Sequence, residues 1–207
     1  MLGWIKNYAR VSIEKPHLGR AFFFFLLPFI LTLVVAFLIG ISVNVMNVGY
    51  NIFLALVAWL LSAVVLFVVV HLFKGHEVSG KFKGIFAGLA FRYFFWFLLM
   101  LLVFVVLFFA MPEFFQIVAK AQKAQTADEA FTILGNNADQ IAGKNALVLF
   151  ASFGIIMLGV AAMLFLTLYL VYELINFCGT GSPRQSLLIL FIWIALQGLI
   201  LALIGTV

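Results

Sequence analysis

Six ionisable residues gather where apolar runs of this sequence end, and they are the first place to look for chemistry. Two histidines and a glutamate form a ligand set that zinc accepts. However, a spacing of five places His71 and His76 about 140° apart on a helix, so they face different directions. We therefore expect no metal site and interpret these residues as polar groups at the water boundary of a membrane. The six are His71, His76, Glu77, Arg92, Glu173 and Arg184.

Glu173 stands apart from the other five because it ends a particularly long apolar run. A carboxylate in such a place needs a polar or cationic neighbour. Arg92 and Arg184 are the cations expected at the same boundary. We therefore expect Glu173 to pair with one of them.

Sequence signatures of catalysis are missing from the chain. Ser182 stands between turn residues in Gly179-Thr180-Gly181-Ser182-Pro183, without the flanking glycines of a nucleophile elbow. The sequence contains no paired-carboxylate motif, no phosphate-binding glycine loop and no His-Glu-x-x-His. We expect no enzyme activity, no catalytic residue and no cofactor.

The elements that position these residues are predicted to be membrane helices. Of the 207 residues, 67% are apolar and 9% are charged, whereas soluble domains are about half apolar and about a quarter charged. A bilayer core of about 30 Å needs about 20 apolar residues in a helix. Continuous apolarity, rather than alternation, argues against a membrane barrel. Five runs qualify: 21–42, 52–73, 91–111, 146–172 and 187–204.

This pattern predicts an all-α integral membrane protein. Residues 1–20 form a cytoplasmic segment, and residues 21–207 form a single five-span domain. Nine of the twelve basic residues fall on one side of the predicted membrane, which places the N-terminus in the cytoplasm and the C-terminus outside. The net charge of +5 is then a topology signal, and we expect no nucleic acid partner.

The outer loop, 112–145, contains a predicted pair of short amphipathic helices. Thr126-Ala127-Asp128-Glu129 reads as a capping box, and Gly135-Asn136-Asn137 closes the helix that follows it. Ahead of the box, Phe114, Phe115 and Val118 form an apolar face suited to the headgroup region. Two interpretations stay open: a partner-binding cap, or a linker that shields the ends of the spans.

The interiors of the five predicted spans contain no ionisable residue, which argues against coupled ion transport. The hydroxyl groups there can bond to their own helix backbone. Gln197 is expected to bond to a neighbouring helix. If the protein instead transports an apolar or small neutral solute, the lining candidates are Gln197, Glu173, Thr167 and Ser152.

A short helix is predicted just before the third span. Glycines recur there at four-residue spacing, at Gly80, Gly84 and Gly88. Such spacing indicates close approach by another helix, with a glycine-rich interfacial helix as the alternative. The opposite face carries an apolar stripe that we expect to dip into the inner leaflet. The stripe comprises Phe82, Ile85, Phe86 and Leu89.

The chain resembles the Yip domain family of Ypt/Rab-interacting membrane proteins. His71-Leu72-Phe73 ends the second span, Gly75 and Gly80 follow, and Lys81-Phe82-Lys83-Gly84 leads into an aromatic third span. The family-like signature residues are His71, Gly75 and Phe82. The segment 168–174, Leu-Tyr-Leu-Val-Tyr-Glu-Leu, is similar to the family's fourth helix.

The resemblance implies five spans with the N-terminus inside. Eukaryotic members also carry a long hydrophilic N-terminus and an Asp-Leu-Tyr-Gly-Pro motif. Here about 20 residues precede the first span and the motif is absent, so binding to a Rab-type GTPase has no support. The chain is more similar to short prokaryotic members. We expect a scaffold or accessory protein of a prokaryotic cell membrane, with the lipid bilayer and a second copy or another membrane protein as partners.

Overall fold

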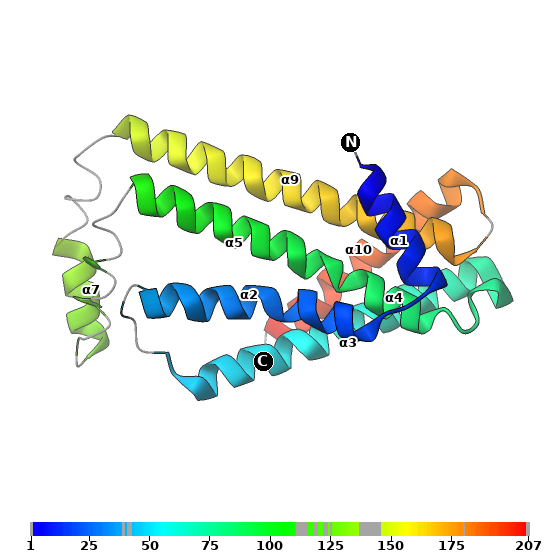
Figure 1. The fold of residues 1–207 in the computed structure, drawn as a ribbon, viewed down its shortest axis with the longest axis horizontal. Coiled ribbons are helices and arrows are strands. Elements are labelled where there is room, and N and C mark those ends of the chain that lie inside the picture. Colours follow the sequence, from blue (N-terminus) through cyan, green and yellow to red (C-terminus); the bar gives the residue numbers. More distant parts are fainter. Residues whose placement is uncertain are drawn as a thin grey trace. The chain divides into compact units, whose positions relative to one another are not determined.

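The regular structure of the chain is helical. The computed structural model describes residues 2–38, 40, 43–110, 116–117, 120–121, 124, 126–136, 146–179 and 181–205, and every regular element in this part is a helix. Figure 1 labels the α-helices, and a 3₁₀ turn, Gly75–Val78, follows α3. The helices are α1 (Gly3–Glu14), α2 (Leu18–Leu38), α3 (Val45–Lys74), α4 (Phe82–Leu89), α5 (Phe91–Ala110), α7 (Ala127–Asn136), α9 (Ala146–Cys178) and α10 (Pro183–Gly205).

Four helical stretches of the described chain are long and apolar enough to cross a membrane. They are Leu18–Leu38, Val45–Val78, Phe82–Phe109 and Phe150–Cys178. The fifth predicted span falls on α10, where the apolar stretch Pro183–Leu199 is shorter than the other four. The four long helices support the prediction of a membrane protein.

Polar side chains fix the starts of three helices. The Asn44 side chain accepts a hydrogen bond from the Met46 backbone N–H at the start of α3 (2.9 Å). Thr126 does the same for the Glu129 N–H in α7 (3.2 Å), where the capping-box sequence predicts a helix to begin. The Ser182 hydroxyl caps α10, whose first residue is a proline. The second predicted loop helix, with Phe114, Phe115 and Val118, lies outside the described residues.

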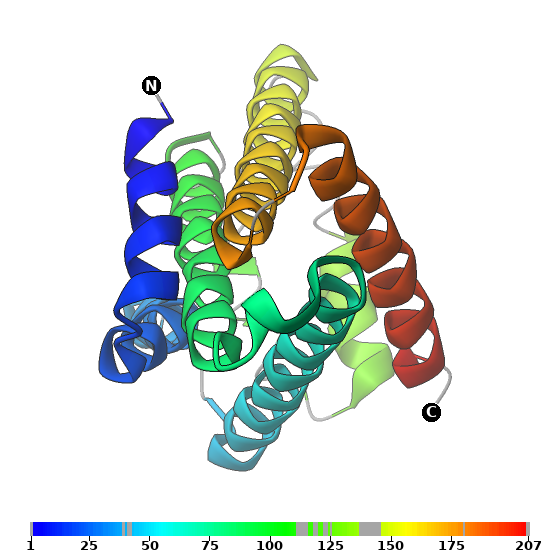
Figure 2. The ribbon, with the colours of Figure 1, turned by 90° about the vertical axis from the view of Figure 1, so that its right-hand side faces the viewer.

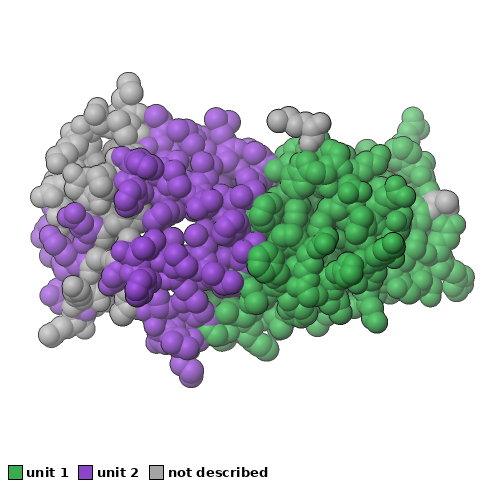
Figure 3. Space-filling model, in the orientation of Figure 1, with its two compact units in different colours: residues 1–26, 49–95, 164–207 green, residues 27–48, 96–163 purple. Residues whose placement is uncertain are grey.

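The chain divides into two compact units, shown in Figure 3. Unit 1 comprises Met1–Leu26, Gly49–Phe95 and Leu164–Val207. Unit 2 comprises Leu27–Val48 and Trp96–Met163. The helices α2, α3, α5 and α9 each contribute residues to both units.

Unit 1 is built around Trp59, whose side chain is fully buried. Its indole ring stacks on Phe25 of α2 and on Phe86 of α4, with ring centroids 5.1 and 4.0 Å away. The indole N–H also donates to the Phe86 backbone oxygen (2.9 Å). Trp59 of α3 thus joins three helices through stacking and one hydrogen bond.

Helix α1 was not predicted, because the segment 1–20 was interpreted only as a charged cytoplasmic tail. Ile5, Ala9 and Ile13 are buried along one face. Their spacing of four residues is the signal that reveals an amphipathic helix. This face packs on α4, and Figure 2 shows α1 running beside the segment that contains α4 and the start of α5.

The predicted interfacial position of the segment before the third span is wrong in one respect. Ile85 and Leu89, expected to dip into lipid, are fully buried within unit 1. The reason is that the chain turns back at Gly80 (φ 84°) and then runs along α3 in the opposite direction. Three contacts record this antiparallel path: Phe82 with Phe67, Phe86 with Trp59, and Tyr93 with Ala55.

Unit 2 is packed through apolar side chains. Gly159 of α9 lies against Leu102 and Leu99 of α5, and a Cβ at this glycine would come within 2.6 Å of the Leu102 side chain. The Thr32 hydroxyl in the interior of α2 donates to the Pro28 backbone oxygen of the same helix (2.9 Å). This bond to its own helix was predicted for Thr32 and is confirmed.

Candidate functional site

Arg92 forms the most unusual polar cluster of unit 1. Its Nη1 donates to the Ser62 hydroxyl (2.9 Å) and its Nη2 to the Tyr93 hydroxyl (3.3 Å). Tyr93 in turn donates to the Ala55 backbone oxygen (3.0 Å). The Trp193 indole N–H donates to the Ser62 backbone oxygen (3.3 Å), which adds α10. We call Ser62, Arg92, Tyr93 and Trp193 the Arg92 cluster.

The cluster lies well inside the length of α3. Ser62 precedes Lys74, the last residue of α3, by about 18 Å of helix axis and follows Val45 by about 26 Å. Ser62 and the guanidinium bonded to it therefore lie at neither end of this helix. Helix α4 carries the start of α5 back along α3, which brings Arg92 to Ser62.

Arg92 has no carboxylate partner among the described residues. The expected ion pairs of Glu173 with Arg92 or Arg184 do not form. Glu173 is buried and interacts with the Tyr169 hydroxyl one turn earlier in α9. Arg184 is exposed at the start of α10. The Arg92 guanidinium is instead held by neutral groups, with its carbon 5.1 Å from the centroid of the Tyr93 ring.

Two lysines cap the C-terminal end of α9. The Lys74 ammonium donates to the Ile175 and Gly179 backbone oxygens (2.7 and 2.9 Å). The Lys81 ammonium donates to the Cys178 backbone oxygen (2.7 Å). The last carbonyls of a helix lack partners and carry partial negative charge, so cations are favoured there. We call Lys74 and Lys81 the lysine cap.

The glycine face of α4 contacts helices of this same chain. A Cβ at Gly84 would lie 2.8 Å from the Ile13 Cα in α1, and one at Gly88 would overlap the Leu174 side chain in α9. Gly80 does not belong to this face, since it precedes α4 and has no atom within 4 Å of a Cβ position. The predicted close helix approach thus involves two glycines, and α1 and α9 occupy it.

Tyr8 adds a hydrogen bond to the contact between α1 and α4. Its hydroxyl donates to the Ala87 backbone oxygen (3.2 Å), and its ring stacks on Phe91 (4.1 Å between centroids). Burial raises the pKa of Tyr8 to about 12, although Ser12 and Arg20 oppose the shift. The phenol is therefore a neutral donor across the ordinary pH range.

The family-like signature residues occupy the turn between α3 and α4. Gly75 has φ 64°, which ends α3 at Lys74, as the Lys74-Gly75 step in the sequence suggests. The His71 and His76 rings lie 6.2 Å apart between centroids, and the buried His71 Nδ1 has no hydrogen-bond partner among the described residues. Phe82 stacks edge to face on Phe67. The described His, Cys, Asp and Glu residues form no cluster of three that would hold a metal ion.

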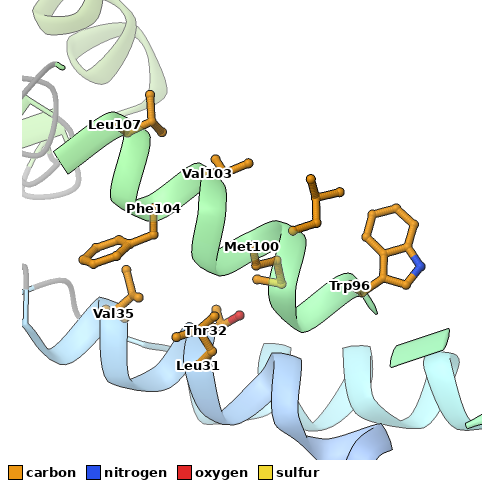
Figure 4. Close-up of a pocket in the computed structure, with 10 residues that line it drawn as sticks. Leu31, Thr32, Val35, Trp96, Met100, Val103, Phe104 and Leu107 are labelled. Carbon is orange, nitrogen blue, oxygen red and sulfur yellow. The ribbon is translucent and has the colours of Figure 1, made fainter. Parts of the chain in front are cut away.

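Unit 2 contains an apolar pocket of about 500 Å³ between α2 and α5. Met100 and Phe104 of α5 extend toward Leu31, Thr32 and Val35 of α2 (Figure 4). Thr32 is the one polar residue of the lining, and its hydroxyl bonds to Pro28. The other lining residues are Ala36, Trp96, Leu99, Val103 and Leu107. An apolar pocket of this size suits a small apolar molecule or part of an acyl chain.

The four residues predicted to line a transport path do not line this pocket. Glu173, Thr167 and Gln197 belong to unit 1, and Ser152 to unit 2. Ser152 and Glu173 are buried, and Thr167 is half-buried. The buried Gln197 Nε2 lacks a hydrogen-bond partner among the described residues, so the bond expected from it to a neighbouring helix is not seen.

Sequence reasoning missed the roles of Ser62 and Trp193. A serine within a span was expected to bond to its own backbone, yet its hydroxyl accepts a bond from Arg92. Trp193 looked like one more apolar residue of the last span. A tryptophan whose N–H lies within a long apolar segment needs an acceptor, and that requirement is the signal that could have identified it.

Comparisons with family models, with curated proteins and with solved structures find no match to this chain.

Proposed function

We propose that this chain is a non-enzymatic, multi-pass protein of a prokaryotic cell membrane that organises or supports other membrane components. The observation that carries the proposal is the use of polar residues in unit 1. The lysine cap and the Arg92 cluster bond α3, α5, α9 and α10 to one another. The polar side chains of the lysine cap and the Arg92 cluster thus hold helices together, which is the use of polar residues that we expect in a scaffold.

The outward surface supports the same proposal. Large apolar side chains are widely exposed, including Phe37 at 83%, Leu72 at 75% and Phe191 at 67%. Such a surface suits contact with lipid tails and with apolar helices of another membrane protein. The Yip-like residues His71, Gly75 and Phe82 agree with this function, which does not require a Rab-type GTPase.

The topology that we propose has five spans, with the N-terminus in the cytoplasm and the C-terminus outside. Single cysteines at Lys6 and at Gly205, in a Cys178→Ala background, test it with a membrane-impermeant maleimide. Five spans predict labelling of the Gly205→Cys variant alone in intact cells, and of both variants after permeabilisation. Labelling of both or neither in intact cells would show an even number of spans.

The scaffold function is tested by isolating the full chain from native membranes in a mild detergent. We expect the chain to migrate above its monomer mass of 23.1 kDa, together with a reproducible second membrane protein or a second copy. A monomer without a partner under several mild detergents would contradict the proposal.

A second candidate function, transport or binding of an apolar or small neutral solute, is favoured by the α2–α5 pocket alone. Replacing Ala36, a buried lining residue, with phenylalanine would fill part of the pocket. Uptake of an apolar fluorescent dye into vesicles containing the protein should then fall to the level of empty vesicles. Equal uptake by both variants would exclude this function for the pocket.

A further inference from the structure

We propose that the pocket between α2 and α5 holds one acyl chain of a membrane phospholipid. This inference rests on the second candidate function, since it names the apolar ligand of the same pocket, and it does not require transport. The lining residues all belong to unit 2 and to two of the candidate membrane spans, Leu18–Leu38 and Phe82–Phe109. Acyl chains are the apolar molecules that surround such spans in a bilayer.

The pocket is elongated along α5. Its lining on this helix runs from Trp96 to Leu107, which is about 16 Å of helix axis. An extended chain advances about 1.2 Å per bond, so about 13 carbons of an acyl chain match this length. Trp96, Met100, Val103 and Leu107 recur at three- and four-residue spacing and form one continuous stripe. A compact apolar molecule would leave part of this stripe without contacts.

The lining offers no free hydrogen-bonding group to an occupant. Thr32 is its one hydroxyl residue, and that hydroxyl donates to the Pro28 backbone oxygen. The Trp96 indole nitrogen lies on the edge of its ring that faces away from the other labelled side chains (Figure 4). A polar solute would lose its bonds to water here without replacement, whereas an acyl chain has none to lose.

The lining reaches the C-terminal ends of both helices. Ala36 lies within one turn of the end of α2, and Leu107 within one turn of the end of α5. Polar residues follow both ends in the sequence, with Asn44 after α2 and Glu113 after α5. Trp96 lies at the opposite end of the lining (Figure 4). The headgroup therefore emerges beyond Ala36 and Leu107, where water can solvate it, and the methyl end of the chain meets Trp96.

The test maps where a photoreactive phospholipid reacts with the purified full chain. Two phosphatidylcholines carry a diazirine on one acyl chain, either next to the ester or at the methyl end. The protein is kept in a bile-salt detergent, which has no alkyl chain to compete. We expect the methyl-end probe to react with Trp96 and Met100, and the ester-end probe to react with Leu107. An excess of unlabelled phosphatidylcholine should suppress both reactions.

A substitution inside the pocket gives the matched comparison. Ala36→Phe places an aromatic ring at a buried lining position and should lower both reactions about tenfold, because the ring and the acyl chain compete for the same space. Ala161→Phe adds the same ring at an exposed alanine of α9 in unit 2 and should react like the wild type. If Ala36→Phe fails to fold, the positions of the two probes on the wild type decide.

Three results would overturn the proposal. Reaction spread equally over exposed α5 side chains such as Leu101 and Val105 would show lipid around the helix and none in the pocket. A reversed order of the two probes would contradict the direction of the chain. Equal reaction in the wild type and in Ala36→Phe would exclude the pocket as the site.

These outcomes are distinct from a failure of the second candidate function. Dye uptake that depends on Ala36, without a phospholipid reaction in the pocket, would assign the pocket to another apolar ligand and contradict the acyl chain. Reaction at Trp96 and Leu107 without dye uptake would exclude transport and support the acyl chain.

Discussion

Units 1 and 2 are packed by different kinds of contact. Unit 1 uses side chains with directional bonds: Trp59 on Phe86, the lysine cap on α9, and Arg92 on Ser62. Unit 2 packs apolar side chains around a pocket whose one polar lining group, Thr32, is satisfied within its own helix. Directional bonds fix the register of one helix on another, whereas apolar contacts leave several packings close in energy. Unit 1 should therefore tolerate substitution less than unit 2.

Replacing a glycine with alanine gives the largest expected difference between the units. In Gly84→Ala the new methyl group meets the backbone of α1 at Ile13, which cannot move aside as a side chain could. We expect a loss of about 3 kcal/mol in the free energy of unfolding. Gly154 of unit 2 has no atom within 4 Å of a Cβ position, so Gly154→Ala should be neutral or stabilising by up to about 1 kcal/mol.

Thermal and denaturant unfolding in the same detergent would measure both variants. If both alanines change stability equally, the distinction between the two units is wrong.

Removal of one member of the lysine cap gives the second largest effect. Lys74→Met keeps most of the apolar stem and deletes the bonds to Ile175 and Gly179. We expect a loss of about 2 kcal/mol, because two backbone oxygens lose a charged donor. Lys83 is exposed on α4, and Lys83→Met should change stability little. Proteolysis of the α9–α10 turn should quicken in Lys74→Met only, and equal rates would contradict the cap.

Tyr8→Phe should cost about 1 kcal/mol, which is the value of one neutral hydrogen bond, here the one to Ala87. The pKa of Tyr8 is raised from 10.0 to about 12 in the folded chain. Folding therefore favours the protonated phenol, and its contribution is full below pH 10 and declines as the pH rises toward 12. The stability difference between wild type and Tyr8→Phe should be constant from pH 7 to pH 9 and smaller at pH 11. A stability difference that grows with pH would contradict the raised pKa of Tyr8.

Thr32→Val in unit 2 should have the smallest effect, within about 0.5 kcal/mol. The hydroxyl bonds only to Pro28 of its own helix, so its loss frees no group of another element. Binding of an apolar dye to the pocket should be unchanged or slightly tighter. A large loss of stability would show that unit 2, too, depends on directional bonds.

Much of the fold was predictable from composition and from local sequence. The apolar runs predicted the long helices, and the capping box at Thr126 predicted a helix start. These features depend on residues close together in the chain. Helix α1 was not predicted, although Ile5, Ala9 and Ile13 have the four-residue spacing of a helix face. The basic residues of this segment are equally typical of a cytoplasmic tail, which is the prediction made here.

The site was less predictable, because its contacts join residues far apart in sequence. The sequence predicts Arg92 at a membrane boundary but does not predict its hydrogen-bond partners. The turn at Gly80 and the packing of Ile85 and Leu89 bring Arg92 back along α3 to Ser62. No local pattern tells whether such a helix lies on the membrane or runs back along α3. The partners Ser62 and Trp193 follow only once that path is known.

The lysine cap has a consequence for the order in which the protein is made. Lys74 and its acceptor oxygens are 101 and 105 residues apart in the chain, and Lys81 and its nearest acceptor are 97 apart. Translation delivers both lysines to the insertion machinery long before the end of α9 exists. Until the end of that helix is made, the ammonium groups of Lys74 and Lys81 lack their carbonyl partners. Arrival of the end of α9 is thus the step that completes the lysine cap, before α10 adds the last part of unit 1.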